Sequence, residues 1–178
     1  MKRAIQPFGN SVVRLRLLSE SDLDMTMAWR NRDDVRIWFK NSQVITHDQN
    51  RAWYARYSER DDDFTFIVEA QGQPVGLAAV YGIDPANATA EVGRFMLAAK
   101  ARGRGYFELA CRQLLRFCAE TLHLKSVFLE VKEENERAIR VYARNGFREV
   151  ANAGGFLRMT CSFSEAAAPY PWGASAAG

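Results

Sequence analysis

The first hydrophobic pattern in the chain has the period of a β-strand. Within residues 12–17, three apolar side chains alternate with two arginines, so one face of the predicted strand is apolar and the other is solvent-exposed. Three more strand-like runs follow, and the segments between them have the Gly, Pro, Asp and Asn composition of tight turns. These runs, at residues 64–69, 75–83 and 89–97, predict a meander of antiparallel strands.

Helical patterns occupy much of the remaining chain. Thr46 and Gln49 fit a capping box, which predicts a helix from there to about residue 58. Apolar residues from Phe107 to Cys118 fall on one stripe and predict a long amphipathic helix. Further helices are predicted at 19–30, 34–39 and 136–145, the last capped by Asn135 and stopped by Gly146, and further strands at 126–131, from 147 and at 156–163.

Bulk composition narrows the class of protein. A chain of 178 residues with 48% hydrophobic and 25% charged residues fits one soluble domain. The net charge of +3 is too small for a polycation built to bind nucleic acid. No apolar run approaches the roughly 20 residues that span a bilayer. We therefore expect a cytoplasmic protein with no nucleic-acid or membrane partner.

The three cysteines and the C-terminal tail add smaller expectations. Three cysteines make neither an even disulfide set nor a pair with metal-ligand spacing, so no metal is expected. The tail, residues 166–178, is rich in Ala and Pro. Its aromatic residues, Tyr170 and Trp172, are expected to anchor it to this domain or to a second copy in a homodimer.

The segment Arg102-Gly103-Arg104-Gly105-Tyr106 carries the most chemical information. It lies between a predicted strand and the long helix. Glycines allow a tight turn with converging N–H groups, and the helix N-terminus adds partial positive charge, so the turn can hold a pyrophosphate. The arginines add full charges. A merely basic, glycine-containing turn is the alternative interpretation of the bare pattern.

A second pair of residues becomes informative through its neighbours. Asn135 and Tyr142 lie seven residues apart, two turns of one helix, and share a face with Ala138 and Ile139. Alone, a capping Asn and a buried aromatic residue would explain the pair. Its place one strand after an anion-binding turn, and before Asn-Gly-Phe at 145–147, makes it more specific.

With these segments the sequence resembles the GNAT superfamily of N-acetyltransferases, most sharply over residues 91–147. The family's coenzyme A signature is Arg or Gln, two residues, Gly, one residue, then Gly or Ala. It maps onto Arg102 and Gly105, and departs at position 107, which is Phe107. The resemblance implies acetyl-CoA as acyl donor and an α/β fold in residues 1–165, with a mixed, mostly antiparallel sheet of six to seven strands flanked by helices.

The resemblance also implies site residues. The strand at 95–97 would pair with the pantetheine arm through its backbone, Asn135 would touch the cofactor, and Tyr142 would lie beside its sulfur. The full set of implied cofactor contacts is Phe95, Met96, Leu97, Arg102, Gly103, Arg104, Gly105, Tyr106, Phe107, Asn135, Ala138 and Tyr142.

Acetyl transfer to an amine requires a base, an oxyanion site and a proton for the departing thiolate. Tyr142 is the candidate acid, the alternative being a packed helix aromatic residue, and a backbone N–H near Met96 or Leu97 is the oxyanion candidate. Glu91 is the candidate base, on a strand face expected to include Phe95 and Leu97; the alternative is a solvated carboxylate. His47 is a rival base.

The acceptor is predicted only by a weaker likeness. The tryptophan- and arginine-rich segment at 29–39, with His47 and the aromatic pair at 53–54, resembles GNAT members that acetylate amino-sugar nucleotides. It also resembles those that acetylate the N-terminal amine of ribosomal proteins. We expect Trp29, Arg30 and His47 to contact the substrate. A non-catalytic acyl-CoA sensor is the rival class, whereas an NTPase is disfavoured because the loop lacks Gly-Lys-Ser/Thr.

Overall fold

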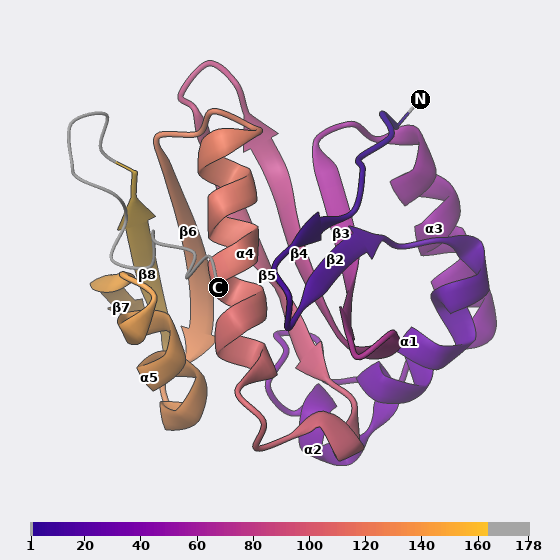
Figure 1. Cartoon of the computed structure of the whole chain (residues 1–178). Coiled ribbons are helices and arrows are strands. Elements are labelled where there is room, and N and C mark those ends of the chain that lie inside the picture. Colours follow the sequence, from indigo (N-terminus) through magenta and orange to yellow (C-terminus); the bar gives the residue numbers. More distant parts are fainter. Residues whose placement is uncertain (1, 164–178) are drawn as a thin grey trace.

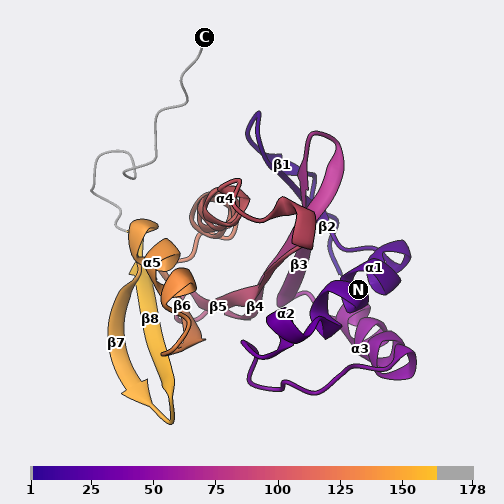
Figure 2. The ribbon, with the colours of Figure 1, turned by 90° about the horizontal axis from the view of Figure 1, so that it is seen from below.

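The computed structural model describes residues 2–163, which form a single sheet covered on both faces by helices (Figures 1 and 2). Within this range the sheet has eight strands in the order β1-β2-β3-β4-β5-β6-β8-β7. The elements are β1 (Phe8–Gly9), β2 (Arg14–Leu17), α1 (Leu23–Asn31), α2 (Asp33–Arg36), α3 (His47–Glu59), β3 (Asp63–Ala70), β4 (Gln73–Asp84), β5 (Thr89–Leu97), α4 (Tyr106–Glu120), β6 (Ser126–Lys132), α5 (Glu136–Arg144), β7 (Arg148–Ala153) and β8 (Phe156–Ser162).

The predicted α/β class and the antiparallel meander are confirmed. Strands β2 to β5 pair antiparallel in chain order, and among the strands of residues 2–163 only the pair β5–β6 is parallel. The sheet has one strand more than the predicted upper count of seven. The extra strand is β1, whose two residues are too few to produce an alternating pattern.

Local signals fix most helix ends. Thr46 and Gln49 form the predicted capping box, and α3 begins at His47, directly after the Thr46 cap. Asn135 caps α5 by accepting a hydrogen bond from the backbone N–H of Ala138 at 3.3 Å. The predicted helix at 19–30 is instead divided, because residues 20–22 form a 3-10 turn, η1, before α1.

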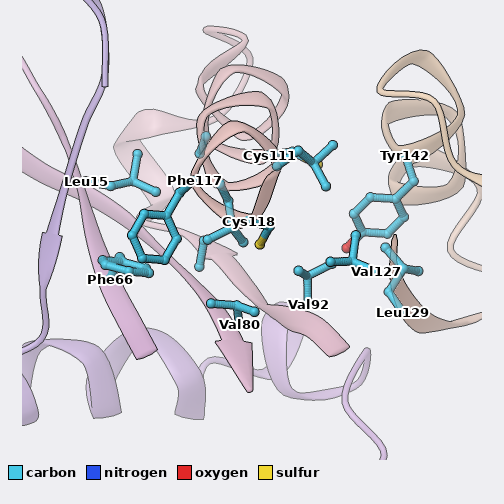
Figure 3. Close-up of a cluster of buried hydrophobic side chains, with 14 of the residues drawn as sticks. Leu15, Phe66, Val80, Val92, Cys111, Phe117, Cys118, Val127, Leu129 and Tyr142 are labelled. Atoms are coloured by element: carbon cyan, nitrogen blue, oxygen red, sulfur yellow. The ribbon is translucent and has the colours of Figure 1, made fainter. Parts of the chain in front are cut away.

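Alternate residues of β3 supply the two cores on either face of the sheet. Phe64 and Phe66 are fully buried and pack against Phe117 of α4. Figure 3 shows Phe66 beside Phe117. Ile67 points to the opposite face and packs with Tyr57 of α3. Because both faces are covered, β3 is an almost continuous buried run rather than a half-wet strand.

Strands β5 and β6 separate part-way along their length. They pair only from Thr89 with Ser126 to Glu91 with Phe128. Beyond that point β5 continues beside β4, and β6 continues beside β8. A bulge in β5 accompanies the separation, since Gly93 and Met96 face residues of β4 that are only two apart, and Arg94 has φ of +54°. The sheet therefore opens at this point.

The expectations about membrane spans and about the C-terminal tail are tested only within residues 2–163. No helix in residues 2–163 is long and apolar enough to cross a membrane. The predicted domain end at residue 165 and the tail with Tyr170 and Trp172 lie outside the described residues, so the domain limits, the anchoring of the tail and the homodimer stay predictions.

Candidate active site

A cleft of about 780 Å³ occupies the region where β5 and β6 diverge. Its walls come from these two strands, from the N-terminal end of α4, from the length of α5, and from α1 and the segment that follows it. The structure brings twelve of the predicted site residues to this one cleft: Arg30, Glu91, Phe95, Met96, Leu97, Arg102, Gly103, Gly105, Phe107, Asn135, Ala138 and Tyr142.

The glycines of the predicted anion-binding loop have the backbone that the loop requires. Gly103 and Gly105 both have φ of +76°, a left-handed conformation that other residues adopt only with strain. Gly105 is also the N-cap of α4. The first N–H groups of a helix have no acceptor inside it, and here they follow the turn at the mouth of the cleft. The loop thus fits a diphosphate.

Positive charge surrounds the loop, in part from residues that sequence analysis did not identify. Arg102 lines the cleft and forms an ion pair with Asp34 of α2 at 2.5 Å. A hydrogen bond from Arg32, the larger contribution, and one from Arg102 lower the pKa of Asp34. Arg137, in the first turn of α5, lines the same cleft and has no ion pair within residues 2–163. Its place two residues after the Asn135 cap was the available signal.

Tyr142 is held in the cleft wall by three phenylalanine rings. Its ring centroid lies 5.7 Å from those of Phe95 and Phe107 and 5.8 Å from that of Phe147. The residue is only 7% exposed, and burial raises the pKa of its hydroxyl well above the ordinary value. Figure 3 shows the ring extending from α5 with its oxygen toward the sheet. Phe107, the departure from the coenzyme A signature, therefore supports the candidate acid.

Glu91 has a partner that the sequence alone did not single out. The hydroxyl of Tyr81 on β4 donates a hydrogen bond to Oε1 of Glu91 at 2.9 Å, and both residues line the cleft. Burial, followed by the negative charge of Glu91, raises the pKa of Tyr81. The two residues are direct partners across the β4–β5 ladder, so the register of the predicted hairpin was the available signal.

The Tyr81 hydroxyl reaches Glu91 because residue 93 is a glycine. A Cβ at Gly93 would lie 2.7 Å from Oη of Tyr81, closer than side-chain carbons approach such atoms. The tyrosine therefore lies directly over the strand backbone. Glycine here is required by close approach and not by backbone angle.

Arg94 fixes the Tyr81 ring from the other side. Its two Nη atoms bond to the two carboxylate oxygens of Asp63 at 2.7 and 2.8 Å, and Nη1 also bonds to Oγ1 of Thr65. The guanidinium carbon lies 4.3 Å from the ring centroid of Tyr81. Because Asp63 is buried, this two-pronged pair is rigid, and it holds the ring that positions Glu91.

The bulge at Arg94 corrects one expectation about strand faces. Glu91, Phe95 and Leu97 were expected to share a face by period-two counting. The extra residue in β5 reverses the phase, so Phe95 and Leu97 pack toward the α4 core while Met96 packs on the other face. The cleft opens at the bulge, which is why residues of both faces reach it.

Of the two expected oxyanion donors, the structure favours Leu97. The N–H of Ala98 bonds to the carbonyl of Val75 on β4. The N–H and C=O groups of successive residues in a strand point to opposite edges of the strand. Those of Met96 therefore also point to β4, and those of Leu97 point to the open side. Nη1 of Arg32 bonds to the Leu97 carbonyl at 3.1 Å, in agreement with this direction.

Four predicted contacts do not line the cleft. Trp29 packs against both core clusters, and Tyr106 is buried in the α4 core. Arg104 lies outside the lining, although its loop is part of it. The side chain of His47 is 67% exposed and its Nδ1 lies 3.4 Å from Oδ1 of Asp24, so it is a surface group at the start of α3 and does not reach Glu91 or Tyr142.

The cysteines have the expected core role. Cys111 and Cys118 are completely buried on α4, and desolvation raises the pKa of both thiols. A thiol held in its neutral form is a weak nucleophile. The geometry therefore favours direct transfer to the amine over an acetyl-cysteine intermediate.

Comparison with known proteins defines the family. A model of the acetyltransferase (GNAT) domain matches residues 13–148, so the chain belongs to this family. The chain is therefore an acyl-CoA-dependent N-acetyltransferase with acetyl-CoA as cosubstrate, as the sequence resemblance implied. It is 25% identical over 141 residues to spermidine N(1)-acetyltransferase of Vibrio cholerae, a match covering 79% of this chain and 81% of that protein.

Two further likenesses agree with this assignment. The acetyltransferase PseH of Campylobacter jejuni is 22% identical over 130 residues, 73% of this chain and 79% of that protein. A crystal structure of the Vibrio cholerae spermidine N-acetyltransferase with CoA and spermine superposes with a TM-score of 0.79 at 23% identity, covering 86% of this chain and 96% of that one. The structural likeness shows a shared fold.

Proposed function

We propose that this enzyme transfers the acetyl group directly to the primary amine of a small molecule, with an amino-sugar nucleotide as the first candidate acceptor. The observation that carries the proposal is the meeting of three groups in one cleft: the glycine-arginine loop, the buried Tyr142, and Glu91 with its Tyr81 partner. Acetyl-CoA supplies the activated thioester when bound.

Each residue has a separate task in the proposed transfer. Glu91, oriented by Tyr81, accepts a proton from the acceptor ammonium so that the amine becomes nucleophilic. The open backbone N–H of Leu97 stabilises the oxyanion that develops on the acetyl carbonyl. Tyr142 keeps its proton because burial raises its pKa, and it donates that proton to the departing sulfur. The second proton, which the attacking nitrogen loses as it becomes the amide, returns to Tyr142. The same dry surroundings make a thiolate more basic, which favours this donation.

The choice of acceptor rests on the acceptor side of the cleft. Trp38, Phe39 and Phe156 line it together with Arg30, which suits a ring system joined to a charged group. Spermidine, named for the Vibrio cholerae relative, is a second candidate because of the sequence likeness. The N-terminal amine of a protein, as in the ribosomal-protein type, is a third.

Thiol release from acetyl-CoA tests the proposal. The enzyme is incubated with an amino-sugar nucleotide, spermidine or an N-terminal peptide, and free CoA is measured over time. We expect amine-dependent release that is fastest with the amino-sugar nucleotide. Faster release with spermidine or the peptide would replace the proposed acceptor, and CoA binding without release by any amine would favour a sensor.

A further inference from the structure

Arg30 of α1 is a buried cation without a counter-charge in the wall of the cleft. It is 9% exposed and lines the cleft, yet within residues 2–163 it forms no ion pair with any carboxylate. Nη2 donates to the backbone carbonyl of Asn41, and the guanidinium carbon lies 4.2 Å from the ring centroid of Phe39. Nη1 is buried and has no hydrogen-bond partner among the described residues.

Such an arrangement is costly in the empty protein. Burial, with a smaller contribution from the nearby Arg36, lowers the pKa of Arg30, because desolvation disfavours its charged form. Buried charges in proteins are ordinarily paired, since an unpaired one loses its hydration without compensation. Here the cation faces a cleft that a substrate enters.

No carboxylate that lines the cleft forms an ion pair with Arg30. Among the described residues, seven arginine or lysine residues and four carboxylates line the cleft; three of these carboxylates are paired with other cations, and Glu91 is hydrogen-bonded to a tyrosine. Asp34 is paired with Arg32 and Arg102, and Glu91 accepts from Tyr81. Glu108 is paired with Arg112 and Arg144, and Glu130 with Lys40 and Arg158.

From this imbalance we infer that the acceptor carries an acidic group, a phosphate or a carboxylate, that binds Arg30. The inference rests on the proposed function and deepens it by giving the acceptor's charge. A fork of N–H donors matches the oxygens of either group, and the Phe39 ring beneath the guanidinium keeps the fork in place. A polyamine brings only further positive charge to a wall in which Glu91 is, among the described residues, the one carboxylate without a cationic partner.

Binding to the CoA-saturated enzyme tests the inference without requiring turnover. CoA occupies its own anion site, and calorimetry then measures affinity for four probes: glucosamine, glucosamine 1-phosphate, glucosaminic acid and spermidine. We expect glucosamine 1-phosphate or glucosaminic acid to bind at least about tenfold more tightly than glucosamine, the effect of one charged hydrogen-bonded pair. Which of the two gains affinity identifies phosphate or carboxylate as the group.

Variants assign the gain to Arg30. R30Q should lose the advantage of the anionic probe, R30K should keep part of it, and R36Q should keep all of it because Arg36 is already paired with Asp33. Unchanged CoA affinity shows that a variant is folded. If R30Q fails this check, the advantage of the anionic probe is compared between R30K and R36Q instead. Equal affinity for anionic and neutral probes, or an advantage that survives at full size in the Arg30 variants, overturns the inference. Absence of thiol release with every amine would overturn the proposed function alone.

Discussion

The Tyr81 hydroxyl lies 2.9 Å from Oε1 of Glu91, on the neighbouring strand of the hairpin that forms one wall of the cleft. This hydrogen bond ties the candidate base to a partly buried ring that contacts Arg94, which is in turn paired with Asp63. Glu91 is therefore oriented by a chain of contacts and is not a freely moving surface carboxylate.

Replacement of Glu91 tests its role as base. E91Q should lower kcat by about 10²-fold, the usual contribution of a positioned base, with little change in the KM for acetyl-CoA. Y81F should lower kcat by about tenfold, because the carboxylate remains but loses its orientation. The double variant should be no slower than E91Q, since both changes affect one function. Independent, additive losses in steady-state kinetics would contradict the link.

Gly93 offers a second test of the same contact. G93A should destabilise the enzyme by about 1–3 kcal/mol, because its Cβ would meet Oη of Tyr81 at 2.7 Å. The next ring atoms lie at 3.5 Å, an ordinary contact. Adding Y81F to G93A should therefore restore most of the stability, measured by urea unfolding, but not the activity. Equal destabilisation with and without the hydroxyl would show that the clash lies elsewhere.

Tyr142 should affect turnover and not cofactor affinity. Y142F removes the proposed proton donor and keeps the ring that packs against Phe95 and Phe107. We expect kcat to fall by at least about 10²-fold while CoA affinity stays the same. Y106F is the matched control, because Tyr106 is a buried tyrosine outside the cleft lining. Near-normal turnover of Y142F would exclude it as the acid.

The loop arginines should affect cofactor affinity. R102Q removes positive charge from the lining next to the helix N-terminus and should weaken CoA binding by about tenfold, a typical value for one charged hydrogen bond. R104Q should weaken it by less, because the Arg104 side chain lies outside the lining. R116Q provides the control, since Arg116 lies near the other end of α4 and is paired with Glu120. CoA affinity is measured by calorimetry. Unchanged affinity in both loop variants would show that the diphosphate binds elsewhere.

Alkaline pH should weaken the fold through its buried tyrosines. Burial raises the pKa of Tyr57 above its ordinary value of 10.0, so above pH 10 the unfolded chain loses this proton while the folded chain keeps it. The free energy of unfolding then falls by about 1.4 kcal/mol per pH unit for such a tyrosine. Between pH 10 and 11, where the unfolded tyrosine is still only partly ionised, Y57F should show a slope in urea unfolding that is shallower by about 1 kcal/mol per pH unit. Identical slopes would contradict the assignment.

The sequence predicted those features that depend on local pattern. The capping box at Thr46, the glycines of the loop and the amphipathic stripe of α4 each follow from neighbouring residues, and the structure contains all three. The bulge at Arg94 did not follow, because nothing local marks an arginine with φ of +54°. It depends on Asp63, which lies 31 residues away in the chain.

The same distinction explains the site residues. Tyr142 and Glu91 belong to the segments that carried the family resemblance. Tyr81 and Arg137 carry no motif of their own; their only signals in the sequence were the register of the predicted hairpin for Tyr81 and the position after the Asn135 cap for Arg137. His47 was weighed for its chemistry, but its position in the first turn of α3 leaves it on the surface, beside Asp24.

A crystal structure of the enzyme with bound CoA would show where the cofactor's diphosphate and sulfur lie. We expect the diphosphate within hydrogen-bonding distance of the backbone N–H groups that follow Gly103, and the sulfur next to the hydroxyl of Tyr142. A diphosphate bound away from this loop, or a sulfur separated from Tyr142 by protein, would contradict this expectation.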